Sequence, residues 1–426
     1  MKTVHPIPNL RWWIAALLAL ATGLSYLDRQ TLPVVATALH ADIPLTNQEF
    51  SRLQFMFLLS YGIMYIGGGR IVDWVGTRLG YTIFIVWWSA ATLFHGFANS
   101  VMGLAAGRLM LGFGEGGGFP ASAKAVSEWF PARDRGLAFG IFNTGSSLGA
   151  IIAPPLLALL ITNLSWRWAF FITGSLGLIW AALWYWLYDQ PRRHARITPK
   201  EREYLAAELP APSAGPRVPW LRLLAMRQVW GLLAAKFLSD SAWYFFLFWL
   251  PKYLADVRGL NVKEIGAFGW IPYVFMGVGS FTGGWLGSHL IRRGFSIDAS
   301  RKIGLAISAS LMPASLLIAS SPLQFAIVLF SVAMLGHQFW ATVLQTLPAD
   351  MFPSSIVGSV AGLMGGVGSF GGMLFNLLIG AMLAGDGNYA PVFVIAGLLH
   401  PLSFVVVLSV IRRINPVLPA SSAAAR

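Results

Sequence analysis

The stretch that decides the fold is residues 12–38, WWIAALLALATGLSYLDRQTLPVVATA. It is apolar over a length that can cross a bilayer, because a transmembrane helix needs about 20 residues. Asp28 and Arg29 nevertheless lie inside it. An unpaired charge at mid-membrane costs about 2.5 kcal/mol or more. Both side chains are therefore expected to face a partner or a water-filled cavity inside a helix bundle.

The whole chain has the composition of a polytopic membrane protein. Of its 426 residues, 56% are hydrophobic and 11% are charged, and the mean hydropathy is +0.65. Soluble domains carry about 25% charged residues. The chain has no cysteine, which excludes disulfides, thiolate metal sites and cysteine nucleophiles. No small-residue cleavage site follows the first apolar run, so we expect a retained first helix rather than a signal peptide.

The apolar stretches predict an all-α membrane protein with twelve transmembrane helices in two six-helix repeats. The expected helices are 12–38, 51–70, 80–98, 101–127, 136–161, 168–188, 229–254, 264–290, 302–320, 323–348, 356–384 and 389–413. The longest break contains several basic residues and the run Pro210-Ala211-Pro212. It predicts an N-terminal half over 1–190, a cytoplasmic linker over 191–227 and a C-terminal half over 228–426.

The distribution of basic residues predicts the orientation in the membrane. With the amino terminus inside, 22 of the 30 lysines and arginines fall on the cytoplasmic side and 5 on the outer side. Cytoplasmic loops are enriched in basic residues, so both termini are expected to be cytoplasmic. The formal net charge of +13 is then a topology signal and gives no reason to expect nucleic-acid binding.

The two halves resemble each other in sequence. A shift of 222 residues places Phe130-Pro131 on Phe352-Pro353 and Gly114-Glu115 on Gly336-His337. Parallel repeats of this kind are typical of transporters, whose substrate site lies between the repeats near mid-membrane. Many of the 45 glycines lie in predicted helices, where small residues let helices pack closely or rock against each other.

Two further charges in the first half lie at membrane depth. Arg108 and Glu115 are seven residues apart in the expected helix 101–127, so they share a face about 10 Å apart. Arg108 is expected at the level of Asp28 and Arg29. We predict that Asp28 pairs with Arg108 and that Arg29 is left for an anionic ligand. The alternative for each charge is a fixed structural ion pair.

The second half has fewer such groups. Lys236 and Asp240 have the i, i+4 spacing of a pair that neutralises itself, which favours a structural role. His337 is either a core histidine or part of a polar cavity wall with Gln338. Tyr244 is our choice for substrate contact in an aromatic helix. The other polar groups on apolar helices are weaker candidates for the site: Gln54, Tyr61, Asn143, Ser369 and Asn376.

Residues 69–78, GRIVDWVGTR, follow the second expected helix. A glycine there permits a tight turn, and Asp73 can pair with a basic side chain or a helix amino terminus. Such a contact can hold a cytoplasmic gate closed, so Gly69, Asp73 and Arg78 are the expected gating residues. The corresponding second-half segment has Ser288 in place of the aspartate, so a second latch is expected to be weaker. We reject a dinucleotide site at residues 112–117, because no strand precedes its glycines.

These motifs resemble the anion:cation symporter branch of the major facilitator superfamily. The resemblance rests on residues 26–30, YLDRQ; on 112–115, GFGE; on 129–131, WFP; and on the segment 69–78. Residues 236–251 and 336–340 are most similar to bacterial hexuronate transporters. The resemblance implies that Arg29 clamps the substrate carboxylate, that Asp28 and Glu115 carry protons, and that Arg108 balances them. Tyr26 and Gln54 match substrate-contact positions.

The expected function is therefore proton-coupled import of a sugar-acid anion by alternating access. The expected partners are a small organic anion, protons and the bilayer of the bacterial inner membrane, with no nucleic acid and no cofactor besides the coupling proton. The protein is expected to be a monomer and not an enzyme. Open alternatives are another organic anion such as galactonate, glucarate or galactarate, a proton-independent exchanger, Na⁺ as the coupling ion, and a membrane sensor.

Overall fold

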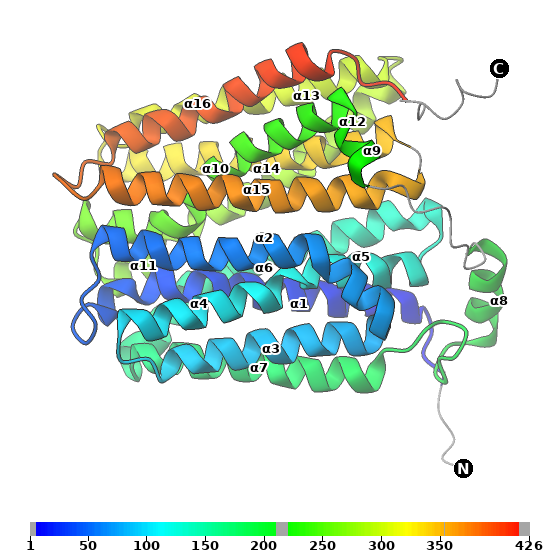
Figure 1. Ribbon diagram of the computed structural model, residues 1–426, viewed down its shortest axis with the longest axis horizontal. Helices are drawn as coiled ribbons and strands as arrows, with labels where there is room; N and C mark the ends of the chain where they lie inside the picture. The colour runs from blue at the N-terminus through cyan, green and yellow to red at the C-terminus, as the bar shows by residue number, and fades with distance from the viewer. Residues whose placement is uncertain (1–5, 210–219, 353, 417–426) are drawn as a thin grey trace. The chain divides into compact units, whose positions relative to one another are not determined.

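The computed structural model describes residues 6–209, 220–352 and 354–416 (Figure 1). Within these ranges the chain is helical without a β-strand, and an isolated bridge joins Ile7 and Ile197. Eight helices in the described ranges are long and apolar enough to cross a membrane. The chain forms two compact units: unit 1 comprises Met1–Leu45, Met56–Ser213 and Gly259–Trp270, and unit 2 comprises Thr46–Phe55, Ala214–Arg258 and Ile271–Arg426.

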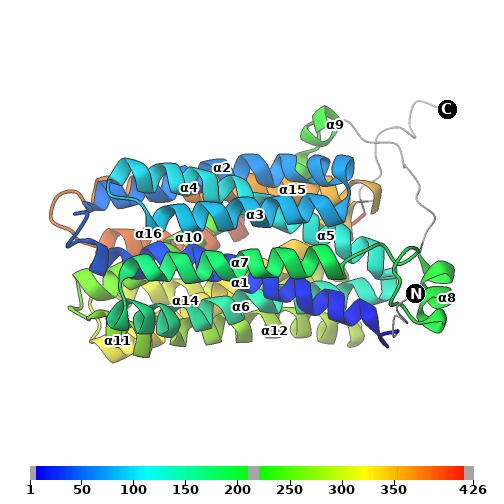
Figure 2. The ribbon, with the colours of Figure 1, turned by 90° about the horizontal axis from the view of Figure 1, so that it is seen from below.

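Unit 1 contains most of the helices from the first half of the chain and one short helix, α11, from the second half. They are α1 (Leu10–Leu39), α2 (Asn47–Val75, from residue 56), α3 (Thr77–Gly96), α4 (Val101–Gly116), α5 (Gly118–Trp129), α6 (Ala132–Asn163), α7 (Trp166–Leu187), α8 (Pro199–Glu208) and α11 (Val262–Phe268). α1 packs along α6, and α3 packs against both α4 and α7. Figures 1 and 2 both show α3 beside α7.

Glycines bring α1 and α6 unusually close. A Cβ added at Gly145 would lie 1.9 Å from the carbonyl oxygen of Ala19. A Cβ added at Gly149 would lie 2.2 Å from the carbonyl oxygen of Gly23. Backbones can approach this closely in a membrane bundle where the residues at the contact are small. The two glycines therefore fix how α1 is placed and rotated against α6.

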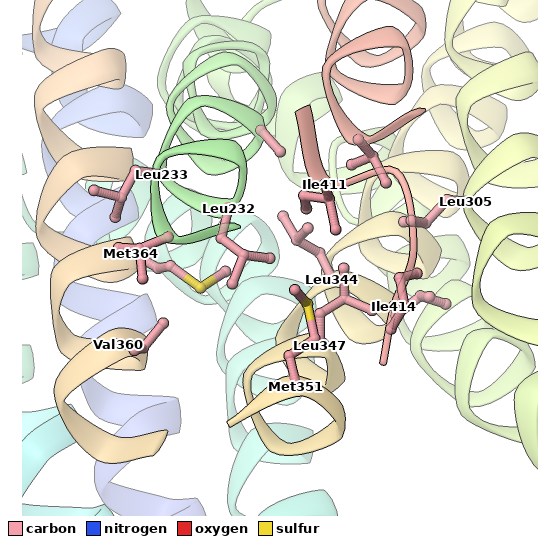
Figure 3. Close-up of a cluster of buried hydrophobic side chains, with 14 of the residues drawn as sticks. Leu232, Leu233, Leu305, Leu344, Leu347, Met351, Val360, Met364, Ile411 and Ile414 are labelled. Atoms are coloured by element: carbon pink, nitrogen blue, oxygen red, sulfur yellow. The ribbon is translucent and has the colours of Figure 1, made fainter. Parts of the chain in front are cut away.

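Unit 2 has its own apolar core. Its helices are α9 (Trp220–Leu224), α10 (Arg227–Asp256), α12 (Ile271–Arg292), α13 (Ile297–Leu311), the 3₁₀-helix η1 (Met312–Leu317), α14 (Leu323–Met351), α15 (Ser354–Met382), α16 (Ala390–Val406) and the π-helix η2 (Val407–Ile411), together with residues 47–55 of α2. Figure 3 shows side chains of α10, α14 and η2 converging, with Leu232, Leu344 and Ile411 among them.

All twelve expected ranges are largely helical, but three of the expected helices are broken. The range 101–127 divides into α4 and α5 at Gly117, which lies within the run Gly116-Gly117-Gly118. Glycine is a poor helix former, and a Cβ at Gly117 would overlap the ring of Phe84. The range 264–290 divides into α11 and α12 just before Pro272, and 302–320 changes from α13 to η1 before Pro313. A proline lacks the N–H that continues a helix.

The first part of the segment expected to be a linker belongs to unit 1 and contains α8. Thr198 caps α8 by accepting a hydrogen bond from the Glu201 N–H. The Glu201 carboxylate in turn accepts hydrogen bonds from the Leu10 and Arg11 N–H groups, 2.9 and 3.2 Å long, at the start of α1. Figure 2 shows α8 near this end of α1. Glu201 thus satisfies helix-terminal donors that α1 cannot satisfy itself. The run Pro210-Ala211-Pro212 lies outside the described residues.

Replacing Glu201 by alanine is expected to lower the free energy of unfolding by about 1 kcal/mol, because α1 loses an N-terminal cap and a favourable charge at its positive end. The measurement is the midpoint of thermal unfolding in detergent. Glu203→Ala is the control, since Glu203 lies on the same helix but is exposed. Equal midpoints for the two variants would refute the capping role of Glu201.

Candidate functional site

A buried ion pair lies inside unit 1. The Arg29 Nε donates to Glu115 Oε2 at 2.5 Å, and the Ser25 hydroxyl donates to the same oxygen at 2.9 Å. Arg29 is 5% exposed and Glu115 is 2% exposed. α1 supplies Ser25 and Arg29 one turn apart, and α4 supplies Glu115. The pair therefore joins two helices through a carboxylate that can exist in a charged or a protonated form.

Aromatic rings surround the Arg29 guanidinium. Its carbon lies 4.9 Å from the ring centre of Tyr26, 4.5 Å from that of Tyr61 and 5.7 Å from that of Phe57. A guanidinium over a ring face is stabilised by about 0.5–2 kcal/mol. Tyr26 and Tyr61, both predicted as substrate contacts, thus contact the guanidinium that was predicted to clamp the substrate. The rings therefore help to hold the guanidinium in place.

The packing of α1 on α6 explains which side chains face α4. Residues 19 and 23 of α1 contact α6, and Gln30 Nε2 donates to the Ala150 carbonyl on the same side. With about 100° of rotation per residue, Asp28 points roughly opposite to this face and Arg29 a further ~100° around the helix. α7 lies on the side of Asp28, where Trp180 Nε1 donates to the Leu17 carbonyl. Asp28 and Arg29 are adjacent in sequence but therefore face different helices.

The predicted pair of Asp28 with Arg108 is wrong. Both carboxylate oxygens of Asp28 and all three guanidinium nitrogens of Arg108 are buried without a hydrogen-bond partner. Arg29 is not left unpaired as that prediction supposed, because it pairs with Glu115. Its role in binding an anionic ligand stays a prediction. Equal depth along two helices does not decide which side chains meet, since their rotation does. Arg108 still lies within electrostatic range of Asp28, Arg29 and Glu115, so two cations and two carboxyl groups share this region.

The other predicted binding residues occupy separate places. Asn143 is half-buried on α6 in unit 1. Gln54 lies on the part of α2 that belongs to unit 2 and is fully buried with neither amide atom hydrogen-bonded. In unit 2, Tyr244 stacks on Phe248, and Gln338 is half-buried on α14. Ser369 donates to the Gly365 carbonyl. Asn376 accepts from Trp249 Nε1 and donates to the Gly372 carbonyl, both at 2.8 Å, so its amide bonds join α10 to α15.

A second set of ionisable groups is buried in unit 2. Lys236 Nζ lies 2.8 Å from Asp240 Oδ1, which confirms the predicted i, i+4 pair. His337 Nδ1 lies 3.1 Å from His400 Nε2, and the ring of Trp243 stacks on His337 at 4.7 Å. His400 was not among the residues predicted for the site. It lies in an apolar helix about 60 residues from His337, and a lone buried histidine gives no pairing signal by itself.

The predicted gating residues lie at the α2–α3 connection. Gly69 lies inside α2, and the turn falls at Gly76, whose φ of 87° favours glycine. Asp73 pairs with Lys124 at 2.8 Å, which confirms a basic partner. Arg78 donates to the Tyr185 carbonyl at 2.7 Å. These contacts tie α2 to α5 and α3 to α7 within unit 1.

At the corresponding end of unit 2, Ser288 donates to the carbonyl of Gly284 in its own helix. The ion pair there is Arg301 with Asp350, at 2.8 Å. Asp350 falls on Glu128 under the shift of 222 residues. Glu128 in turn accepts a hydrogen bond from Thr77 at 2.8 Å. The internal repeat therefore pointed to both Glu128 and Asp350, whereas the motif at 69–78 pointed to neither.

Comparison with known proteins agrees with this architecture. The profile of the Major Facilitator Superfamily matches residues 18–376. The hexuronate transporter of Escherichia coli (strain K12) is 35% identical over 416 residues, which are 96% of each chain. The galacturonate transporter of Dickeya chrysanthemi is 36% identical over 312 residues, 72% of this chain and 90% of that one. A solved bacterial homologue of the human lysosomal transporter Spinster has a TM-score of 0.69 at 19% identity, covering 95% of this chain and 96% of that one.

The family match and the transporters among its relatives identify the chain as a membrane transporter rather than an enzyme, and its long apolar helices fit a multi-pass protein. The chain belongs to the Major Facilitator Superfamily. The bacterial relatives and the apolar helices support a location in a bacterial inner membrane.

Proposed function

We propose that this protein is a secondary active transporter that imports a sugar-acid anion, a hexuronate such as galacturonate or glucuronate, together with protons by alternating access. The named activities of the two similar transporters support the substrate class. The buried arginine supports an anionic substrate, since a guanidinium can donate two parallel hydrogen bonds to a carboxylate.

The observation that carries the proposal is the Arg29–Glu115 ion pair. Glu115 occupies the guanidinium that a substrate carboxylate would use, so it competes with the substrate. Protonation of Glu115 removes its charge, weakens the pair and makes Arg29 available to the substrate. Loading of the anion and of a proton are then coupled at one guanidinium. Asp28 is the second proton site, and Arg108 balances the carboxylates.

Energetics favour proton coupling of this kind. An anion that enters against an inside-negative potential loses about 2.3 kcal/mol per 100 mV for each charge. One proton makes the step electroneutral, and two protons let the potential drive accumulation. Asp28 and Glu115 are two buried carboxyl groups, so they could carry the two protons that the second case needs.

The remaining parts of the proposal concern architecture. We place twelve transmembrane helices in two six-helix halves, 1–190 and 228–426, joined by a cytoplasmic linker over 191–227, with both termini cytoplasmic and the protein a monomer. Gly69, Asp73 and Arg78 form a cytoplasmic gate in the first half. The eight apolar helices and the contacts of Asp73 and Arg78 support this arrangement.

The test is uptake of labelled galacturonate by purified protein in liposomes, with and without an inward proton gradient. Gradient-driven accumulation that unlabelled hexuronates block is the expected result. If galactonate, glucarate or galactarate blocked uptake and hexuronates did not, the substrate would be one of those other sugar acids. Counterflow that does not depend on pH would identify a proton-independent exchanger, and dependence on a sodium gradient would replace the proton as coupling ion.

Glu115→Gln is expected to lose proton-driven accumulation but to keep counterflow exchange. The amide preserves the size of the side chain and mimics a carboxyl group that is always protonated, so Arg29 stays available to substrate. The measurement compares both modes in the same liposomes, with Glu203→Gln as the exposed control. Gradient-driven accumulation at the wild-type level in Glu115→Gln would remove Glu115 from the coupling mechanism.

A further inference from the structure

A row of buried polar groups in unit 1 has several side-chain atoms that make no well-formed hydrogen bond within the protein. The row runs along one side of α3 and includes groups from α1 and α7. Its unpaired atoms are both carboxylate oxygens of Asp28, the hydroxyls of Ser89, Thr92 and Thr173, Trp88 Nε1 and His95 Nε2. All of these side chains belong to residues that are buried. Native proteins leave few buried polar groups unmatched, so this concentration requires an explanation.

These groups lie next to one another between the helices. The carboxyl group of Asp28 lies near enough to the hydroxyls of Thr92 on α3 and Thr173 on α7 to interact with them, although neither contact has the geometry of a well-formed hydrogen bond. One turn further along α7, a Cβ added at Gly177 would meet the Ser89 hydroxyl at 2.1 Å and Trp88 Nε1 at 3.6 Å. Ser89 and Thr92 are three residues apart on α3, about 4.5 Å along its axis. The row is therefore continuous from Asp28 to the Trp88 indole.

At the other end, His95 extends the row toward α4. A Cβ added at Gly107 would meet its ring at 2.8 Å, and His95 Nδ1 hydrogen-bonds to the Ala91 carbonyl. Arg108 follows Gly107 in α4, and its three guanidinium nitrogens are also buried without partners. His95 and Arg108 lie within electrostatic range of each other.

The chemistry of the row favours water over an ion. A bound cation would be repelled by Arg108 and could not accept a hydrogen bond from the Trp88 indole. A bound anion would be repelled by Asp28. Water both donates and accepts, and a buried water molecule typically makes about three hydrogen bonds to otherwise unmatched polar groups. A chain of water molecules matches carboxylate, hydroxyl, indole and guanidinium groups together.

We propose that Asp28 exchanges its proton through a hydrated passage inside unit 1, between α1, α3, α4 and α7, with Ser89, Thr92 and Thr173 lining it. This inference rests on the proposed proton coupling and adds a route for the proton. The carboxyl O–H bond of Asp28 breaks as a water oxygen takes the proton, and the carboxylate is later reprotonated from the same water. Thr92 and Thr173 are positioning residues, which hold that water against the carboxyl group.

The charged surroundings of Asp28 fit this role. The charged groups that act on it are Glu115 and Arg108, both on α4, whereas α3 and α7 present hydroxyls. Glu115 is held by Arg29 and Ser25 on a different side of α1. The two carboxyl groups thus have separate environments: Glu115 shares a guanidinium with the substrate, and Asp28 faces the passage.

The first test measures water access directly and does not depend on transport. Because the chain has no cysteine, Thr92→Cys carries the only thiol in the protein. We expect its infrared S–H band to convert to S–D soon after transfer into D₂O. Ala91→Cys is the control, since Ala91 is a fully buried apolar neighbour on the same helix and its thiol should keep the S–H band far longer. Equally slow exchange in both variants would overturn the hydrated passage.

The second test measures proton-driven uptake in liposomes. Thr92→Val with Thr173→Val should slow gradient-driven uptake on the order of tenfold, the factor that loss of a hydrogen bond typically produces. Counterflow, which needs no net proton movement, should stay at the wild-type rate and show that the variant is folded. Thr92→Ser should restore uptake. Thr82→Val is the matched control, because that α3 hydroxyl is already bonded to the Arg78 carbonyl.

The two tests separate failure of the passage from failure of the proposed symport. Wild-type gradient-driven uptake in the double valine variant would overturn the passage and leave symport intact. Proton-independent uptake by the wild-type protein would refute symport and with it the proton route, even if the thiol at position 92 exchanges rapidly.

Discussion

Arg29→Ala is expected to abolish galacturonate uptake and to weaken binding by at least about 100-fold. Truncating one partner of a buried, hydrogen-bonded charge pair costs about 2–5 kcal/mol, and each 1.4 kcal/mol is about tenfold in affinity. The alanine removes the donor for the substrate carboxylate. It also leaves Glu115 buried without its cation, so Glu115 must be protonated even without substrate. Binding is measured by calorimetry on the purified protein, and uptake is measured in liposomes.

Two further variants separate charge from geometry. Arg29→Lys keeps the positive charge but loses the planar fork, so its affinity should fall between those of wild type and alanine. Arg52→Ala removes an exposed arginine from α2 and should bind as wild type. Wild-type affinity in Arg29→Ala would show that the substrate carboxylate binds elsewhere and would remove the basis for competition with Glu115.

Gly145→Ala is expected to be the most damaging small substitution in the bundle. The new methyl group would meet the Ala19 carbonyl oxygen at 1.9 Å, and backbone cannot move aside as a flexible side chain can. Overpacking typically costs about 1–3 kcal/mol, and a clash with backbone belongs at the upper end. We expect a lower yield of monodisperse protein and a lower melting midpoint in detergent.

Gly140→Ala is a closely matched control. Gly140 lies on the same helix, α6, but nothing lies within 4 Å of its added Cβ. Alanine is also the better helix former, so this variant should be as stable as wild type or slightly more stable. Equal melting midpoints for Gly145→Ala and Gly140→Ala would show that the close approach of α1 and α6 does not determine the stability of the bundle.

Displacement of α1 would also change the site around Arg29 and Glu115. Gly145 and Gly149 hold the face of α1 opposite Asp28, so any rotation of α1 changes which helix Asp28 and Arg29 face. Surviving Gly145→Ala protein should therefore bind galacturonate more weakly than Gly140→Ala protein. A variant with a lowered melting midpoint but wild-type affinity would show that the packing stabilises the bundle without setting the site.

Much of the fold could be predicted from the sequence. Hydropathy is a property of residues taken in order, so all twelve expected ranges are largely helical in the structure. The breaks at Gly117 and before Pro272 were missed because an apolar run gives no signal when a helix ends and another begins inside it. The i, i+4 pair of Lys236 and Asp240 was predicted correctly because both partners lie on one helix with fixed geometry.

Pairs between helices could not be predicted in the same way. Depth in the membrane follows from counting residues, and it placed Asp28, Arg29 and Arg108 at one level but Glu115 about two turns away, whereas Arg29 pairs with Glu115. The partner of each charge depends on the rotation of α1, and adjacent residues differ by about 100° in direction. That rotation is set by contacts such as those of Gly145 with Ala19, which join residues more than a hundred positions apart.

The sequence by itself therefore determined the membrane class, the helical ranges and the presence of buried charges, because each depends on local composition and length. Only the tertiary structure decided that Arg29 pairs with Glu115, and that Asp28 faces the hydroxyls of Thr92 and Thr173. A pairing between helices is a property of how their backbones pack, and close packing is decided by the small residues at the contact rather than by the charges that it brings together.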